Sequence, residues 1–229
     1  MTKNALIVGV GSGLSASLAR KLKGEGYKVG LASRNTDKLG ALKKEIDGAT
    51  FACDATEPAQ VAKLFAEVEK QIGPLDFVCF NAGFRVRGPV VELEPADVLK
   101  TLVSSAYGGF LVGQEAAKRM APRGQGAIFF TGASASMKGY PQSAPFAMAK
   151  FALRGLAQSM ARELSSKGIH IAHFDIDGGI RSAQRPVPAD KPDSLLDPDA
   201  IAQTYIDVLK QHRSAWSLEV EVRPWVENF

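Results

Sequence analysis

The chain has 229 residues, of which 45% are hydrophobic and 23% charged, a composition typical of folded globular proteins and unlike that of disordered, collagen-like or coiled-coil chains. Lys and Arg (28) outnumber Asp and Glu (24), which gives a formal net charge of +4. The absence of any long run of like charges argues against nucleic-acid binding. The only cysteines, Cys53 and Cys79, lie in apolar runs and exclude a disulfide framework, so we expect two buried thiols.

The sequence predicts a protein that does not enter a membrane. No segment approaches the roughly 20 apolar residues of a membrane-spanning helix. Met1-Thr2-Lys3-Asn4 leads directly into a strand pattern without the apolar region of a signal peptide. We therefore expect a cytoplasmic protein.

Short apolar strands alternate with amphipathic helices along the chain. In order, the pattern predicts strand 5–8, helix 14–23, strand 28–32, helix 36–46, strand 50–53, helix 58–72, strand 77–80, helix 95–120, strand 127–131, helix 146–166, strand 170–176, a helix capped by Asp197 with Pro198 as its first residue, and an exposed or edge strand over 216–222. The strands are continuously apolar, as in parallel sheets covered by helices on both faces. We expect a single α/β domain, residues 1–229, with a doubly wound parallel sheet.

A glycine-rich turn, Gly9-Val10-Gly11-Ser12-Gly13, lies between the first strand and the first helix. Glycines let the backbone approach a ligand, and the unpaired N–H groups at the start of a helix attract a phosphate. By itself such a pattern fits a plain tight turn equally well. Its position after the first strand of an alternating α/β chain favours dinucleotide binding.

Three motifs at strand ends resemble those of the short-chain dehydrogenase/reductase family, and the resemblance extends over essentially the whole chain. Residues 9–15 resemble its G-x-x-x-G-x-G turn, with Ser15 in place of the last glycine. Asn81-Ala82-Gly83 resembles its N-A-G motif, and Asp54 its adenine-contacting aspartate; alone, Asp54 reads as a helix cap. The resemblance implies a Rossmann fold that binds a nicotinamide dinucleotide.

The end of the second strand indicates which dinucleotide is bound. The sequence Ser33-Arg34-Asn35 has no carboxylate to bind the ribose 2′-OH of NAD, whereas Arg34, assisted by Lys38, suits a 2′-phosphate. We therefore expect NADP in preference to NAD. The residues expected at the cofactor are Gly9, Gly11, Ser12, Gly13, Leu14, Ser33, Arg34, Asn35, Asp54, Ala55, Asn81, Ala82, Gly83, Lys150, Gly178, Ile180 and Ser182.

The family's catalytic positions are largely substituted. The resemblance implies a Tyr-x-x-x-Lys pair for proton transfer and ribose binding, a serine that holds the substrate oxygen, and an asparagine in the preceding helix. Here Lys150 is retained, but Phe146, Ala133 and Ser105 stand at the tyrosine, serine and asparagine positions. Phenylalanine cannot donate a proton, so the usual proton chemistry is missing.

Three hypotheses follow from these substitutions. A redox enzyme with a relocated donor would use Tyr140 or Ser134, the nearest hydroxyls, although Tyr140 fits an aromatic packing role equally well. A redox enzyme without a side-chain donor would take the proton from water or Ser134 and act on an activated acceptor such as a quinone. A non-catalytic NADP(H)-binding sensor or assembly protein would keep Lys150 for binding alone. We favour an oxidoreductase with Lys150, Tyr140 and Ser134 as the catalytic candidates.

A hydrolase and a metalloprotein are disfavoured. Residues 132–136 resemble a G-x-S-x-G elbow without its last glycine. His170 and His173 are expected on opposite faces of a strand, and His212 on a late helix, so no base or metal-ligand cluster is predicted.

The segment after the sixth predicted strand resembles the family's Pro-Gly turn, with Asp177 in place of the proline and Ser182 in place of a threonine. Asp177 is an acid–base candidate, although a turn aspartate that caps its own loop is the favoured interpretation. Residues 183–196 correspond to the family's substrate lid. The pocket candidates, which suggest an apolar carbonyl or quinone substrate, are Phe84, Val86, Met137, Tyr140 and Phe146.

Small and apolar residues occupy several faces of the two long helices, which therefore need a partner. Because the family pairs subunits through these helices, the resemblance implies a homodimer or homotetramer. We expect Trp225 and Phe229 in the tail to dock on a neighbouring subunit, with a flexible tail as the alternative.

Overall fold

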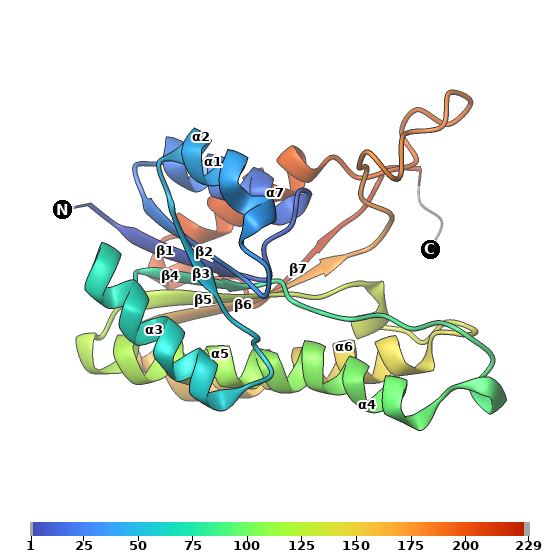
Figure 1. Ribbon diagram of the computed structural model, residues 1–229, viewed down its shortest axis with the longest axis horizontal. Helices are drawn as coiled ribbons and strands as arrows, with labels where there is room; N and C mark the ends of the chain where they lie inside the picture. The colour runs from blue at the N-terminus through green and yellow to red at the C-terminus, as the bar shows by residue number, and fades with distance from the viewer. Residues whose placement is uncertain (1, 227–229) are drawn as a thin grey trace.

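A computed structural model describes residues 2–226 and contains a seven-stranded sheet (Figure 1). The strand order is β3-β2-β1-β4-β5-β6-β7, and all neighbouring strands are parallel. The strands are β1 (Asn4–Val8), β2 (Lys28–Ser33), β3 (Ala49–Ala52), β4 (Phe77–Phe80), β5 (Gly126–Thr131), β6 (Ile169–Ile176) and β7 (Glu219–Val222). The predicted doubly wound parallel sheet is confirmed.

Helices cover both faces of this sheet. The helices are α1 (Leu14–Gly24), α2 (Gly40–Ile46), α3 (Pro58–Ile72), α4 (Pro95–Leu102), α5 (Gly108–Met120), α6 (Ala144–Leu164) and α7 (Pro198–Leu209). Helices α1, α2 and α7 lie on one face, and α3 to α6 on the other (Figure 1). Neighbouring strand residues such as Leu6 and Ile7 are both 0% exposed but belong to the two different cores, which explains the continuously apolar strands.

Two predicted elements differ from the structure. The helix predicted over 95–120 is divided by a π-helical turn, Val103–Tyr107. Just after this turn, a Cβ added at Gly109 would lie only 2.4 Å from the Leu153 side chain of α6. The helix therefore packs closely against α6 here, which the spacing of apolar residues in the sequence does not reveal. The last strand begins at Glu219 rather than at residue 216, because Trp216 stacks on His170 of β6 with ring centroids 4.8 Å apart.

Several local predictions are confirmed. Both cysteines are buried, and burial raises the thiol pKa to about 11 for Cys53 and about 12 for Cys79. The Asp197 carboxylate caps α7 by accepting a hydrogen bond from the Asp199 N–H at 2.8 Å.

Within residues 2–226, none of the helices combines the length and apolar character needed to span a membrane.

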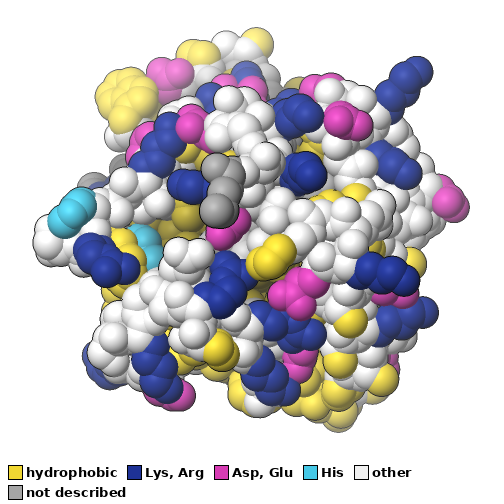
Figure 2. Space-filling model, turned by 90° about the vertical axis from the view of Figure 1, so that its left-hand side faces the viewer, with side chains coloured by type: hydrophobic (Ala, Val, Ile, Leu, Met, Phe, Trp, Pro, Cys, Tyr) yellow, Lys and Arg dark blue, Asp and Glu magenta, His cyan; other side chains and the backbone are white. Residues whose placement is uncertain are grey.

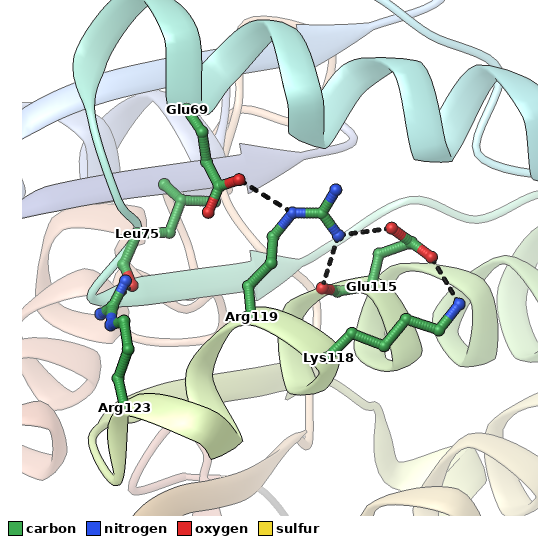
Figure 3. Close-up of polar contacts among 6 residues, drawn as sticks. All are labelled: Glu69, Leu75, Glu115, Lys118, Arg119 and Arg123. Atoms are coloured by element: carbon green, nitrogen blue, oxygen red, sulfur yellow. Dashed lines mark hydrogen bonds and ion pairs between the residues drawn. The ribbon is translucent and has the colours of Figure 1, made fainter.

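Ion pairs bind neighbouring helices together on the outer side of the α3–α6 layer. Arg119 of α5 donates to Glu69 of α3 at 3.1 Å and also pairs with Glu115 of its own helix (Figure 3). Arg123 donates to the Leu75 carbonyl at 2.7 Å, just before β4 (Figure 3). Lys and Arg side chains are interspersed with Asp and Glu on the face in Figure 2.

An ion pair binds the edge strand β7 to α6 and makes the folding stability depend on pH. Arg154 donates two hydrogen bonds to Glu219, at 2.7 and 2.8 Å, and Gln158 donates a third at 2.6 Å. The hydrogen bond from Arg154 is the main reason that the pKa of Glu219 falls from 4.5 to about 2. Because the folded pKa lies below the unfolded one, this stabilisation is complete above pH 4.5 and is lost as the pH falls towards 2.

Replacing Arg154 with methionine is therefore expected to lower the free energy of unfolding by about 1 kcal/mol at neutral pH, since solvent screens this partly exposed pair. Near the folded pKa of Glu219 the difference from the parent should disappear. Urea unfolding at both pH values measures this, with Arg162→Met as the control, because Arg162 of the same helix donates only to the Gln158 carbonyl. An equal loss at both pH values would contradict the assignment to the ion pair.

Candidate active site

A cleft of about 540 Å³ opens at the carboxyl ends of the central strands. Its lining comes mainly from the segments at the ends of β1, β4, β5 and β6 and from the start of α6. The strand-end segments contribute Gly9, Gly11, Gly13, Leu14, Ser15, residues 81–85, residues 131–135, Ile176, Gly178, residues 180–182 and Arg185. A second cleft of about 320 Å³ shares Gly9, Gly11 and residues 81–83 and continues to the ends of β2 and β3. The two clefts meet at β1 and β4, where the strand order reverses, which is the usual ligand position in open α/β sheets.

Gly9 brings the turn after β1 against the loop after β4. Its φ is +91°, and an added Cβ would lie 2.3 Å from the backbone nitrogen of Ala82, so no other residue fits without displacing this backbone. At Gly11 and Gly13 an added Cβ meets no protein atom within 4 Å, so this part of the turn faces open space. No side chain caps the start of α1, and no acidic residue lies in its first turn. The turn therefore fits a pyrophosphate group.

Ser15, which departs from the family's glycine pattern, has a defined role here. Its hydroxyl donates to the Gly9 carbonyl at 3.2 Å and accepts a hydrogen bond from the Asn81 side-chain amide at 2.6 Å. Ser15 thus links the glycine turn to the N-A-G segment. Sequence reasoning noted Ser15 only as a departure, because the serine–asparagine contact spans 66 positions of the chain.

The second cleft contains the residues predicted to select the cofactor. Arg34 and Lys38 line it and are exposed at the end of β2. Asp54 also lines it and accepts hydrogen bonds from the Thr56 N–H at 3.0 Å and hydroxyl at 2.8 Å. The backbone hydrogen bond from Thr56 lowers the pKa of Asp54, and the Arg34 charge adds to this effect. Asp54 therefore orders its own loop, while α3 is preceded by Glu57, so Asp54 is not the helix cap.

Lys150 is buried and lines the first cleft. Its Nζ donates to the Thr131 carbonyl at 2.7 Å, and burial lowers its pKa from 10.5 to about 8. The ring of Phe146, one helical turn earlier, lies between two cations: Lys150 Nζ is 5.6 Å from the ring centroid and the Arg85 guanidinium carbon 4.6 Å. The Phe146 ring therefore contacts cations and has no acidic proton to donate.

Tyr140 and Ser134 both line this cleft together with Lys150 and Phe146. Tyr140 is 40% exposed. Lys138 Nζ lies 5.7 Å from the centroid of the Tyr140 ring and 3.9 Å from an Asp177 carboxylate oxygen. The Tyr140 ring therefore has an ammonium group close to it.

The remaining predicted residues fall into three groups. Ala55 lines the second cleft, Gly178, Ile180 and Ser182 line the first, and Ser12 is exposed outside both linings. Of the apolar pocket candidates, Phe84, Tyr140 and Phe146 line the first cleft, whereas Val86 and Met137 do not.

Two buried serines near the clefts have hydroxyls without a hydrogen-bond partner among residues 2–226. Ser105, at the asparagine position, is buried in the π-helical turn outside both linings, and its hydroxyl has no hydrogen-bond partner. Ser143 lines the first cleft and is 1% exposed, and its hydroxyl is also without a partner. Sequence reasoning missed Ser143, because nothing in the local pattern separates it from an ordinary residue at a helix start.

A serine–histidine contact does occur, but it does not form a nucleophile. Ser136 Oγ lies 3.2 Å from His173 Nε2, and both residues are 1% exposed or less. Burial lowers the pKa of His173 to about 4. Among the described residues, 2–226, no group of three or more His, Cys, Asp or Glu is placed to hold a metal ion.

The fold and the paired clefts define a doubly wound α/β protein of Rossmann type. A family model described as short chain dehydrogenase matches residues 3–179, and the chain belongs to the short-chain dehydrogenase/reductase family.

Among curated relatives, gluconate 5-dehydrogenase of Gluconobacter oxydans is 31% identical over 172 residues, which is 73% of this chain and 67% of the relative. The 3-oxoacyl-[acyl-carrier-protein] reductase MabA of Mycobacterium avium is 28% identical over 169 residues, 74% of this chain but only 64% of that protein.

Solved structures match over nearly the whole chain. A short-chain dehydrogenase from Rhodopseudomonas palustris is 36% identical with a TM-score of 0.85, covering 97% of this chain and 99% of that one. A metagenomic short-chain oxidoreductase in complex with NADP is 26% identical with a TM-score of 0.83, covering 98% of both chains.

Proposed function

We propose that the protein is an NADP(H)-dependent oxidoreductase that interconverts a carbonyl and an alcohol, with Tyr140 as the proton donor. The observation that carries this proposal is that Tyr140 lines the same cleft as Lys150, while Phe146 fills the usual donor position. Family membership and the NADP complex of a similar structure support the cofactor class.

The chain's own residues account for binding and for the proton. The glycine turn and the start of α1 would hold the cofactor's pyrophosphate, and Lys150, which lines the same cleft, would bind its nicotinamide ribose. When bound, the reduced cofactor supplies a hydride that forms the new C–H bond at the carbonyl carbon.

Tyr140 donates its proton to the carbonyl oxygen as the C=O π electrons form the O–H bond, so the carbonyl is reduced and the cofactor oxidised. Tyr140 then regains a proton from solvent, because its side chain is partly exposed.

NADP preference is assigned to Arg34. Replacing Arg34 with aspartate is expected to weaken NADPH binding by about 10- to 100-fold, since a charge-assisted contact to the 2′-phosphate is lost, and to strengthen NADH binding. Fluorescence titration with both cofactors measures this. Arg162→Asp, an identical change of charge on the surface of α6, should leave both affinities unchanged. Equal weakening of both cofactors by Arg34→Asp would remove Arg34 from cofactor selection.

A non-catalytic cofactor-binding protein is the second candidate. Phe146 has no acidic proton, and the Lys150 Nζ already donates a hydrogen bond to a backbone carbonyl. NADPH oxidation against a panel of aldehydes, ketones, diketones and quinones separates the two candidates, with NADPH binding followed in parallel. Turnover on any of them supports the oxidoreductase. Tight binding without turnover overturns it in favour of the second candidate.

We also propose that the chain self-associates through the outer side of α4, α5 and α6. Leu99, Phe110, Met148 and Phe151 are each at least 41% exposed on these helices, and such exposed apolar side chains favour an interface. In the tail, Trp225 is 82% exposed and donates to Asp193 at 3.0 Å, while Phe229 lies outside the described residues. Light scattering of the purified chain measures its oligomeric state.

A further inference from the structure

Cationic side chains gather around the cleft that contains Tyr140. Arg85, Lys150, Arg181 and Arg185 line it, and no Asp or Glu is among the described residues of this lining. Two of these charges are already engaged: Arg181 pairs with Asp197 at 2.6 Å, and the Lys150 Nζ donates to the Thr131 carbonyl. The charges left facing the cleft are those of Arg85 and Arg185.

These two guanidinium groups have no carboxylate partner within residues 2–226, unlike several other arginines of the chain. Ion pairs with Asp or Glu are formed by Arg20, Arg119, Arg123, Arg154 and Arg181. The pKa of Arg85 is instead lowered, mainly by burial and further by the like charges of Arg87 and Arg185. The like charges of arginines around one cleft repel one another, and a bound anion would offset this repulsion.

The position of Arg85 assigns this anion to the substrate rather than to the cofactor. Its guanidinium stacks on the ring of Phe146, 4.6 Å from the centroid, and Phe146 occupies the place where the family's proton donor faces the substrate. Arg34, expected at the cofactor's 2′-phosphate, lines the second cleft, whereas Arg85 lines the first cleft together with Phe146. Phe146 thereby gains a role as a platform that orients Arg85.

We propose that the cleft binds a carbonyl substrate that carries a carboxylate or a phosphate, held by the guanidinium groups of Arg85 and Arg185. The inference rests on the proposed function, deepens it by naming the substrate class, and replaces the apolar substrate expected from the aromatic residues alone. A forked guanidinium donates two parallel hydrogen bonds to either anion.

The test uses two matched pairs of probes: acetoacetate against methyl acetoacetate, and dihydroxyacetone phosphate against dihydroxyacetone. Binding of each to the protein saturated with NADP⁺ is measured by calorimetry, and reduction of each by NADPH is measured separately. The first pair reports a carboxylate and the second a phosphate. Arg87→Gln is the matched control, because Arg87 belongs to the same loop and carries the same charge but does not line the cleft.

At least one charged probe is expected to bind more tightly than its neutral partner, and Arg85→Gln to weaken that binding by about 10- to 100-fold while Arg87→Gln does not. Arg185→Gln should act in the same direction. If no charged probe exceeds its neutral partner, or if Arg85→Gln weakens NADP⁺ binding instead, the inference is wrong. Charge-dependent binding without any turnover would support the anion site and contradict the oxidoreductase. Turnover of the neutral probes alone, unaffected by Arg85→Gln, would support the oxidoreductase and contradict the anion site.

Discussion

Tyr140→Phe is expected to lower kcat by about 10²–10⁴-fold, the usual contribution of a positioned general acid, while leaving NADPH binding unchanged. The substitution removes only the hydroxyl, and the aromatic ring that lines the cleft is kept. Stopped-flow measurement of NADPH oxidation, alongside fluorescence titration of NADPH, separates the loss of chemistry from a loss of binding.

Tyr107→Phe is the matched control, because this tyrosine is 43% exposed and lies outside both cleft linings. Adding Phe146→Tyr to the Tyr140→Phe variant places a hydroxyl one helical turn from Lys150 and should restore part of the activity. An unchanged kcat in Tyr140→Phe would show that Tyr140 is only a packing residue. Ser134→Ala would then test the second hydroxyl proposed as a proton donor.

Gly9→Ala is expected to lower the free energy of unfolding by about 2–5 kcal/mol and to abolish tight NADPH binding. About 1–2 kcal/mol comes from an L-residue in a left-handed conformation, and about 1–3 kcal/mol from forcing the facing backbone apart. The added Cβ would lie 2.3 Å from the Ala82 nitrogen and 2.5 Å from its Cα, and backbone atoms cannot rotate away as a side chain can.

Urea unfolding and NADPH titration measure both effects of Gly9→Ala. Gly40→Ala is the control, because Gly40 has a helical φ of −56° and an added Cβ there meets nothing within 4 Å. That variant should match the parent or be more stable by up to about 1 kcal/mol. Parental stability in Gly9→Ala would mean that the loop after β4 can move away, contrary to the close contact described above.

The cofactor clefts follow closely from local sequence. Gly9, Asn81 and Arg34 each come directly after a predicted strand, and parallel strands bring their carboxyl ends to one edge of the sheet. Strand order and the role of Ser15 did not follow, because the hydrogen bond between Ser15 and Asn81 depends on how distant loops meet. The π-helical turn at Val103–Tyr107 was missed for a similar reason, since its residues have ordinary helical spacing.

The alternation of strands and helices, the glycine turn and the loss of the tyrosine at Phe146 were determined by the sequence itself, because each depends on residues close together in the chain. Only the tertiary structure decided which hydroxyl and which cations face the cleft. Tyr140 and Arg85 come from loops that different strands position, and whether an arginine meets a carboxylate depends on neighbours far along the chain. The aromatic pocket candidates therefore suggested an apolar substrate, whereas folding placed at the cleft two guanidinium groups that have no carboxylate partner within residues 2–226.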